Sequence, residues 1–211
     1  SILYHSLWQD DGFQLMIHSY CRQIRQQRPA VVMLCNPNNP TGAGLSREEI
    51  LVVAQACRSV GAYLVVDEAF LEFHPHWRSR TLLTETPDHV VVLCSMTKFY
   101  AVPGLRLGFL AAPAAVVSAV SRLRDPWSVN ALAQLAGVYL LQDEVFAEQS
   151  AAVVTKLACS LWEQLDAVPK ITVYPVSANY IFGKCNAMPS SELQRKCLDH
   201  GILIRDCSNY I

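Results

Sequence analysis

The sequence lacks any block of basic residues, and its charges almost cancel. Seventeen Lys and Arg residues stand against 18 Asp and Glu residues, so the formal net charge over 211 residues is −1. A chain without a positive patch lacks the basic surface that attracts nucleic acid or an anionic membrane. The composition therefore favours a small-molecule partner, because a small anion needs only one or two local arginines.

From the sequence we expect neither a membrane-spanning helix nor a secretory leader. No run approaches the roughly 20 residues of a membrane-spanning helix, and the start, SILYHSLWQDDG, has no basic segment followed by an apolar one. The chain lacks an initial Met, and both of its ends lie at strand-like segments. We therefore expect a cytoplasmic protein and a fragment of a longer chain.

Closely spaced cysteine pairs are missing as well. The eight cysteines are scattered, and several lie in apolar runs, which is typical of reduced thiols in a cytosolic protein. His74 and His76 could in principle share a metal ion, but one proline separates them and no third ligand is near, so a surface loop is the preferred interpretation. The sequence predicts no metal site.

Short apolar runs alternate with amphipathic stretches in the first two thirds of the chain. Strands are predicted over residues 30–35, 62–70, 89–94 and 105–112, and helices over 13–27 and about 46–61. Ser46 and Glu49 have the spacing of a capping box at the start of the second helix. This alternation predicts an α/β fold with a parallel or mixed sheet that helices cover on both faces.

A helical stretch separates this region from a smaller part. Residues 130–164 are predicted to form one long helix or two joined helices. Beyond them, strands are predicted over 170–176, 178–184 and 201–207, with a helix over 190–200. We place the boundary near Asp143, so that residues 1–143 form a large domain and residues 144–211 a small α+β domain.

Polar residues follow the predicted strands at their carboxyl ends: Asn39, Asp67, Ser95 and Lys98. Ligands of open α/β sheets bind in the crevice outside these ends. Each residue alone has an ordinary explanation, since an isolated lysine is most often a surface side chain and an aspartate after a strand most often caps a turn. Their coincidence at one edge of the sheet is what favours a binding site.

The lysine stands in an apolar run, SMTKFYAVPGLRLGF, with Arg106 eight residues later. We expect a buried amine, because a lysine that is desolvated in a crevice becomes nucleophilic enough to form a Schiff base. Arg106 with the hydroxyls of Ser95 and Thr97 can hold a phosphate. Asp67 on the neighbouring strand can keep a ring nitrogen protonated. These are together the requirements of pyridoxal phosphate.

Motifs in this order and spacing resemble the fold-type-I, pyridoxal-phosphate-dependent enzymes of the class I/II aminotransferase superfamily. They are NPNNPTG (residues 36–42), DEAFLEF (67–73) and SMTKFYAVPGLRLG (95–108), and further similarity runs through 126–137, 172–182 and 202–210. The resemblance implies a mostly parallel sheet of the seven-stranded type, incomplete in this chain, with a small C-terminal domain. It also implies a homodimer.

The resemblance assigns roles to the polar residues at the strand ends. It makes Lys98 the lysine that forms the Schiff base with the cofactor, Asp67 the partner of the pyridine nitrogen, and Asn39 a donor to the ring hydroxyl. Three residues become the cofactor's phosphate site: Ser95, Thr97 and Arg106. The implied cofactor is pyridoxal 5'-phosphate, and the implied substrate is a small phosphorylated amino acid.

Substrate contacts are implied by the same resemblance. Arg205 matches the arginine that pairs with the substrate's α-carboxylate, and Asn39 and Asn179 are expected to line the pocket. Phe70 departs from the wider superfamily, which often has a tyrosine there that contacts the ring hydroxyl. Phe70 and the segment RDCSNY resemble the threonine-phosphate decarboxylases of cobalamin biosynthesis more closely than the histidinol-phosphate aminotransferases, and so they favour the first of these two.

The implied activity is decarboxylation of L-threonine O-3-phosphate to (R)-1-amino-2-propanol O-2-phosphate. The alternative is a histidinol-phosphate-type aminotransferase, since both reactions use the same lysine, aspartate and phosphate site. A second alternative is a catalytically silent fragment that only folds or binds a partner, because members of the family are considerably longer.

Overall fold

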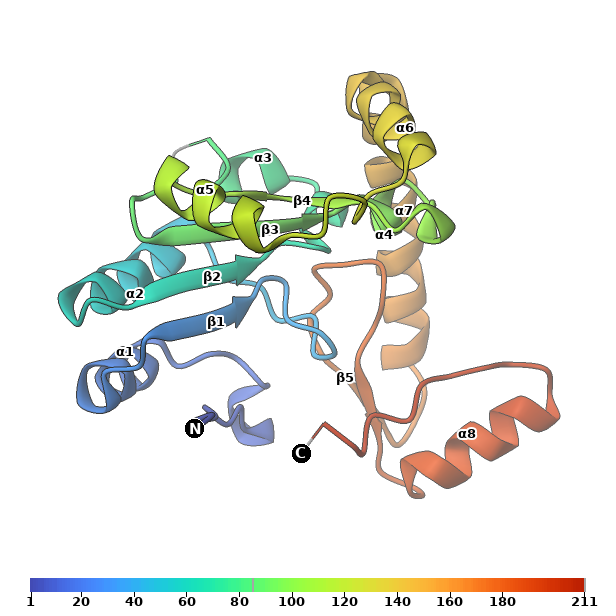
Figure 1. Cartoon of the computed structure of the whole chain (residues 1–211). Coiled ribbons are helices and arrows are strands. Elements are labelled where there is room, and N and C mark those ends of the chain that lie inside the picture. Colours follow the sequence, from blue (N-terminus) through green and yellow to red (C-terminus); the bar gives the residue numbers. More distant parts are fainter. Residues whose placement is uncertain (85, 211) are drawn as a thin grey trace.

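Four strands form the central sheet, and neighbouring strands follow one another in the sequence (Figure 1). The computed structural model of the chain describes residues 1–84 and 86–210. The strands are β1 (Val31–Cys35), β2 (Tyr63–Asp67), β3 (Val90–Ser95) and β4 (Gly108–Ala111). β1, β2 and β3 run parallel, and β4 pairs antiparallel with β3. The predicted α/β class with a mostly parallel sheet is confirmed.

Helices α1 (Ile17–Gln27) and α2 (Arg47–Ser59) connect the amino-terminal segment, β1 and β2. The predicted capping box is present, since the Ser46 hydroxyl accepts the Glu49 N–H at 3.2 Å and the Glu49 carboxylate accepts the Ser46 N–H at 2.8 Å. α1 begins later than predicted. Phe13 has a φ of 57°, outside the range of a right-handed helix, so the residues before Ile17 form a separate turn.

The main hydrophobic core lies between these two helices and one face of the sheet. Its members are apolar residues with at most 6% exposure, among them Ile24, Val32, Ile50, Val53, Leu64, Val66, Val90 and Val92. The alternating residues of each strand point to the other face. That face is only partly covered, since Val31 and Met33 of the edge strand β1 are 53% and 66% exposed.

Short elements connect the remaining strands. The single turns of 3-10 helix are η1 (Gln9–Asp11), η2 (Leu71–Phe73) and η3 (Pro103–Leu105). Two short α-helices are α3 (Trp77–Arg80) and α4 (Met96–Phe99), and α5 (Ala114–Leu123) follows β4.

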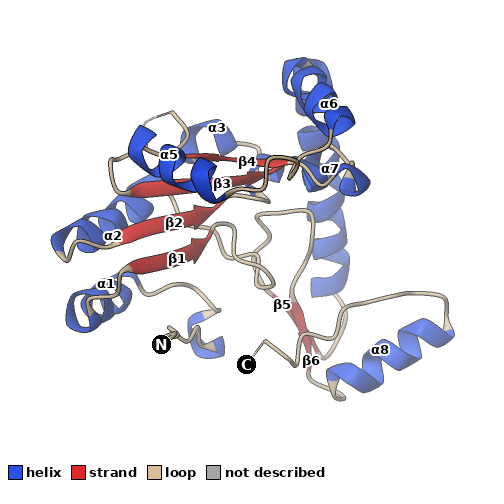
Figure 2. Cartoon of the chain, in the orientation of Figure 1, coloured by secondary structure: helices blue, strands red, loops and turns tan. Residues whose placement is uncertain are grey.

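The predicted helical region over 130–164 consists of two helices, α6 (Ala131–Gln142) and α7 (Glu144–Asp166). The break falls at Asp143, whose carboxylate accepts the Phe146 N–H at 2.9 Å and so caps α7. The predicted strand over 170–176 forms β5 (Ile171–Val173), which pairs antiparallel with β6 (Gly183–Cys185), and α8 (Ser190–Asp199) matches the predicted helix (Figure 2). The division into two domains stays a prediction.

Two predicted strands of the C-terminal part are wrong. In residues 178–184 only the end joins β6, because the preceding residues turn toward the loop after β1. Residues 201–207 form no strand. Ile202 and Leu203 are 57% and 80% exposed, and the Ile202 N–H bonds back to the carbonyl of Cys197 in α8. An apolar run needs a neighbouring strand before it can pair, and the described residues supply none there.

A second apolar cluster joins the two parts of the chain. Phe73, Met96, Phe99 and Tyr100 are buried, and partly buried residues of α6 and α7 pack against them. The ring of Phe99 meets Phe73 edge-on, with centroids 5.2 Å apart. The long helix α7 thus lies against the segment that carries Lys98 (Figure 1).

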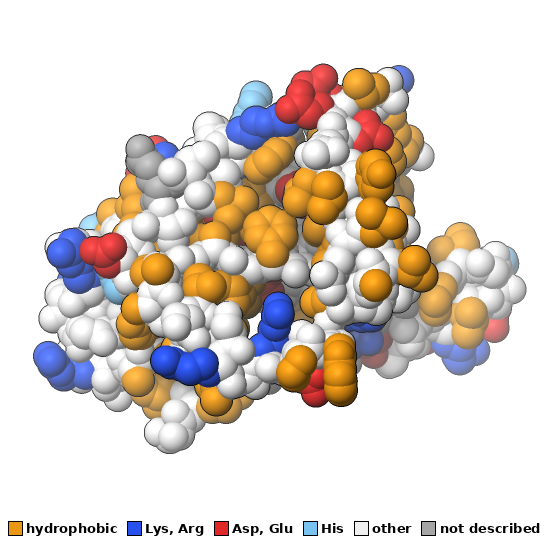
Figure 3. Space-filling model, turned by 45° about the horizontal axis from the view of Figure 1, so that its top comes forward, with side chains coloured by type: hydrophobic (Ala, Val, Ile, Leu, Met, Phe, Trp, Pro, Cys, Tyr) orange, Lys and Arg blue, Asp and Glu red, His pale blue; other side chains and the backbone are white. Residues whose placement is uncertain are grey.

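Much of the remaining apolar surface is exposed. On α6, five large apolar side chains are at least 55% exposed: Leu132, Leu135, Val138, Tyr139 and Leu141. Figure 3 shows hydrophobic side chains gathered over this part of the molecule. No helix within the described ranges is long and apolar enough to cross a membrane.

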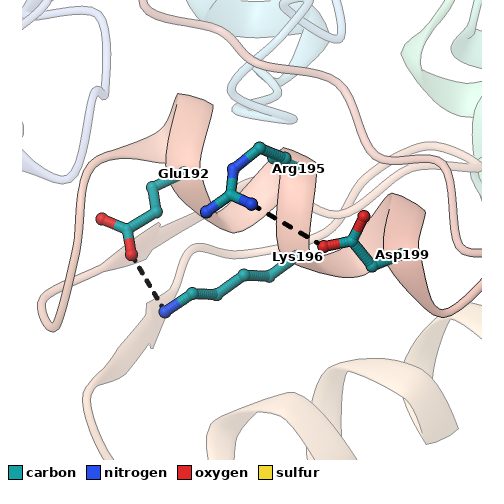
Figure 4. Close-up of polar contacts among 4 residues, drawn as sticks. All are labelled: Glu192, Arg195, Lys196 and Asp199. Atoms are coloured by element: carbon teal, nitrogen blue, oxygen red, sulfur yellow. Dashed lines mark ion pairs between the residues drawn. The ribbon is translucent and has the colours of Figure 1, made fainter.

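Helix α8 has a different surface, on which charged side chains pair along the helix (Figure 4). Lys196 Nζ lies 2.9 Å from Glu192 Oε1, and Arg195 Nη1 lies 3.8 Å from Asp199 Oδ2. All four side chains are well exposed, so the solvent screens both pairs and they add little to the stability of the fold.

Candidate active site

The carboxyl ends of β1, β2 and β3 meet at one edge of the sheet, and backbone hydrogen bonds hold their continuations together. The Asn36 N–H donates to the Asp67 carbonyl at 2.9 Å, and the Glu68 N–H donates to the Leu93 carbonyl at 2.8 Å. The predicted polar residues that follow these strands are therefore brought to one edge, where ligands of open α/β sheets bind.

The loop after β1 is held by its own side chains. Asn36 is 1% exposed, and its amide oxygen accepts the Leu45 N–H at 2.7 Å. The Asn38 amide donates to the Thr41 hydroxyl at 2.9 Å, and the Gly42 N–H donates to the Asn38 carbonyl at 2.8 Å. Asn39 is exposed at the tip of this loop. These hydrogen bonds hold the loop, and the amide side chain of Asn39 is exposed to solvent at its tip.

Asp67 and Ser95 lie on the same face of the sheet. Asp67 pairs in register with Leu93, and Ser95 stands two residues farther along the same strand. Because side chains alternate between faces, these two point to the face opposite the main core. Asp67 is half-buried, and one of its carboxylate oxygens accepts the Ala69 N–H at 2.9 Å.

Lys98 lies in α4, directly after β3. The Ser95 hydroxyl is 2.8 Å from the hydroxyl of Thr97, which is buried. The expectation that Lys98 is buried is wrong for the described chain, because its side chain is exposed while Phe99 and Tyr100 are buried. The short helix turns its apolar residues into the cluster with α7 and leaves the lysine on the open side.

Arg106 is brought back toward Ser95 by the antiparallel pairing of β4 with β3. Ser95 pairs with Gly108, and the Met96 N–H donates to the Leu107 carbonyl at 3.1 Å. Arg106 has a φ of 53°, its guanidinium donates to the Pro103 carbonyl at 3.1 Å, and its side chain is exposed. A cation and two hydroxyls therefore stand at the end of β3.

The two predicted substrate residues of the C-terminal part are placed differently. Asn179 is exposed, but its neighbour Tyr180 bonds to the loop after β1, so Asn179 lies beside the candidate site. Arg205 is also exposed, and its contacts are local: Nη2 is 3.5 Å from Asn209 Oδ1, and the guanidinium is 5.8 Å from the ring centre of Tyr210. Within the described ranges, no hydrogen bond or ion pair joins Arg205 to the strand ends.

Two residues that hold the site together were missed by the sequence analysis. Asn36 belongs to a recognised motif, and its place directly after an apolar run was a signal for a buried side chain that fixes the loop. Tyr180 gave no such signal, since its partner Asn38 is 142 residues away in the sequence. Burial raises the pKa of the Tyr180 hydroxyl, and the nearby Cys35 and Asp67 raise it further.

A groove of about 880 Å³ runs along the outer edge of β1, between the strand and the amino-terminal segment. Its lining reaches the candidate site at Cys35 and Asn38 but does not include Lys98. The candidate site lies at the strand ends rather than in this groove, because the polar groups suited to chemistry lie at the strand ends. No cluster of metal-ligating side chains occurs in the part of the chain that the structure describes.

Two carboxylates follow Asp67, of which Glu68 is buried and Glu72 is partly buried. Glu68 is 4% exposed and accepts hydrogen bonds from the Thr81 hydroxyl and the Leu82 N–H. Burial raises the pKa of Glu68. Burial, with repulsion from Glu68, raises the pKa of Glu72 to about 7. Glu72 therefore holds a proton more tightly in the folded than in the unfolded chain.

Replacing Glu72 by glutamine is expected to stabilise the protein above neutral pH. The pKa of the Glu72 carboxyl is 4.5 in the unfolded chain and about 7 in the folded chain. Its favourable contribution to the free energy of unfolding is therefore complete below about pH 4.5, and it is lost as the pH rises through about 7. At pH 8 the variant should unfold with a free energy about 1–3 kcal/mol higher than wild type. Urea unfolding at pH 5 and pH 8 measures this. The exposed Glu148→Gln serves as control, and an equal gain at both pH values would contradict the pKa assignment.

The groups at the strand ends fit the chemical needs of pyridoxal phosphate. An exposed amine, a carboxylate on the neighbouring strand, and two hydroxyls with a guanidinium gather at one edge of the sheet. An amine can bond an aldehyde, a carboxylate can hold a ring nitrogen protonated, and hydroxyls with a guanidinium can bind a phosphate.

Comparisons with known proteins agree with this chemistry. Residues 2–210 match the family described as aminotransferase class I and II. The chain is 41% identical over 180 residues to the threonine-phosphate decarboxylase of Salmonella typhimurium, which covers 85% of this chain and 49% of that protein. The chain spans about half the length of the curated relatives it matches.

Solved structures with the same fold are also found. The histidinol-phosphate aminotransferase of Clostridium acetobutylicum superposes with a TM-score of 0.89 at 25% identity, over 96% of this chain and 61% of that one. The histidinol-phosphate aminotransferase of Sinorhizobium meliloti, solved in complex with pyridoxal 5'-phosphate, superposes with a TM-score of 0.79 at 22% identity, over 90% of this chain and 52% of that one.

Proposed function

The chain belongs to the aminotransferase class I and II family, whose cofactor is pyridoxal phosphate, and on that premise we propose that it acts in a threonine-phosphate decarboxylase. The proposed reaction converts L-threonine O-3-phosphate to (R)-1-amino-2-propanol O-2-phosphate, within cobalamin biosynthesis. The observation that carries this proposal is the similarity to the Salmonella decarboxylase, which extends over most of the chain.

The residues at the strand ends are proposed to hold the cofactor. The phosphate site consists of Ser95, Thr97 and Arg106. Asp67 keeps a proton on the ring nitrogen, and Asn39 donates a hydrogen bond to the ring oxygen. When bound, pyridoxal phosphate supplies an aldehyde for amines and a protonated ring that accepts the electrons of a bond broken next to the substrate nitrogen.

Lys98 and Arg205 are proposed to act on the substrate. With the cofactor present, the Lys98 amine would be the group that holds its aldehyde, and as a free amine it would move a proton to or from the reacting carbon of the substrate. Arg205 orients the α-carboxylate through its two parallel N–H groups, and Asn179 lines the pocket beside the loop after β1. The orientation of the carboxylate decides whether carbon dioxide or a proton is lost.

An aminotransferase of the histidinol-phosphate type is the second candidate. The structural similarity to such an enzyme favours it, and the groups that hold the cofactor are the same for both reactions. The residue at position 70 supports the decarboxylase, because Phe70 lacks the hydroxyl that the wider superfamily often has there. A chain that only folds or binds a partner is the third candidate, since the chain spans about half of its relatives.

One assay separates the three candidates. The protein is incubated with pyridoxal phosphate and L-threonine O-3-phosphate, and both carbon dioxide release and amino transfer to 2-oxoglutarate are measured. We expect carbon dioxide release without amino transfer. Amino transfer without carbon dioxide would establish the second candidate, and absence of both products, together with no change in cofactor absorbance, would establish the third.

A cytoplasmic homodimer completes the proposal. The family resemblance implies the dimer, and the exposed apolar side chains of α6 support it, because contiguous apolar surface of this kind marks an interaction site. Light scattering after size-exclusion chromatography tests it, with Leu135→Glu as the variant. We expect the wild-type mass to be twice that of the chain and the variant to be a monomer.

A further inference from the structure

Tyr180 connects the C-terminal part of the chain to the loop after β1. Its hydroxyl donates a hydrogen bond of 2.8 Å to the Asn38 carbonyl. Its ring meets Phe70 edge-on, with centroids 5.1 Å apart and an interplanar angle of 87°. Figure 2 shows the segment between β5 and β6 beside the loop that follows β1. The Tyr180 side chain thus contacts Asn38, which precedes Asn39, and Phe70, which lies three residues after Asp67.

The fit between the two segments is close. Gly42 has a φ of +73°, and a Cβ there would lie 3.1 Å from the Pro175 carbonyl oxygen and 4.0 Å from the Tyr180 ring. At Gly44 a Cβ would lie 3.2 Å from the Ser177 hydroxyl. The glycines of the loop therefore permit residues 175–180 to pack directly on it, with no room for side chains between them.

The Asn38 carbonyl is the point on which this contact acts. It accepts the Gly42 N–H, which closes the loop, and the Tyr180 hydroxyl, each at 2.8 Å. This carbonyl belongs to the planar peptide group that leads into Asn39, so holding it fixes the position of the Asn39 N–H and Cα, from which the side chain leaves the loop. Burial raises the pKa of the Tyr180 hydroxyl, which keeps it protonated and a donor.

We propose that Tyr180 is a positioning residue that holds the loop after β1, and through it Asn39, in the orientation that the cofactor requires. Phe70 has no hydroxyl to offer, so Asn39 is the main donor to the ring oxygen and its orientation matters more. This inference rests on the proposed function for the role of Asn39. The contact between Tyr180 and the loop does not depend on that function, because the hydrogen bond to the Asn38 carbonyl is formed within the chain.

The first test measures hydrogen exchange in the free chain. Tyr180→Phe removes only the hydroxyl. We expect the backbone amides of residues 36–44 to exchange about fivefold faster, because the variant loses the net stabilisation of one hydrogen bond. Tyr174→Phe is the matched control, since this buried tyrosine packs on Phe13 and Phe182 instead of the loop. Unchanged exchange in Tyr180→Phe would overturn the proposal.

The second test separates positioning from mere stabilisation. The absorbance of pyridoxal phosphate bound to the protein is titrated against pH in wild type, Tyr180→Phe and Tyr174→Phe. A weaker hydrogen bond from Asn39 favours the protonated ring oxygen, so the pH midpoint of Tyr180→Phe should rise by about half a unit, while Tyr174→Phe should match wild type. Faster exchange with an unchanged midpoint would overturn the positioning role.

A wild-type chain without Lys98-dependent absorbance would instead contradict the proposed function. Hydrogen exchange alone would then decide whether Tyr180 holds the loop.

Discussion

Replacing Lys98 by alanine is expected to abolish the absorbance change that follows addition of pyridoxal phosphate and to lower kcat by roughly 10²–10⁴-fold. Lys98 supplies the only amine at the edge where the carboxylate, hydroxyls and guanidinium gather, within the described ranges. Without it the cofactor keeps its phosphate and ring contacts but has no protein amine to bond. We therefore expect retained, weaker binding together with the spectrum of free pyridoxal phosphate.

The matched control is Lys156→Ala, which removes an exposed lysine from α7. Spectrophotometric titration of wild type and both variants separates loss of the bond from loss of binding, and equilibrium dialysis measures binding directly. Identical spectra for wild type and Lys98→Ala would remove Lys98 from the site. A loss of absorbance in Lys156→Ala as well would point to general damage.

The sheet could be predicted because its signals are local. The three parallel strands are short apolar runs that end in or are followed by a polar residue. The helix between β1 and β2 is indicated by the capping-box spacing of Ser46 and Glu49. The placement of Asp67 and Ser95 at one edge follows from parallel pairing alone. These expectations required no knowledge of distant contacts.

The remaining features depend on contacts that no local pattern encodes. The burial of Lys98 was predicted from its apolar neighbours, but α4 turns Phe99 and Tyr100 into the cluster with α7 and leaves Lys98 exposed. The contact between Tyr180 and Asn38 joins residues 142 positions apart. Residues 201–207 have the composition of a strand, but pairing requires a neighbour, which the composition does not reveal.

Gly108→Ala is expected to destabilise the protein and to weaken cofactor binding at the same time. A Cβ at this position would lie 2.7 Å from the carbonyl oxygen of Cys94, a backbone atom of β3. No side chain can rotate to relieve this clash, so the two strands must separate. Overpacking of this kind lowers the free energy of unfolding by about 1–3 kcal/mol, which urea unfolding measures.

The effect on the cofactor follows from register. Gly108 pairs with Ser95 and stands two residues after Arg106, so separating the strands moves the guanidinium away from the hydroxyls of Ser95 and Thr97. Gly104→Ala is the matched control, because a Cβ at that position meets nothing within 4 Å. We expect Gly108→Ala to bind pyridoxal phosphate and inorganic phosphate more weakly than Gly104→Ala does. If Gly108→Ala lost stability but kept wild-type affinity for both ligands, Arg106 would not contribute to the phosphate site, because the position of its guanidinium relative to Ser95 depends on this strand pair.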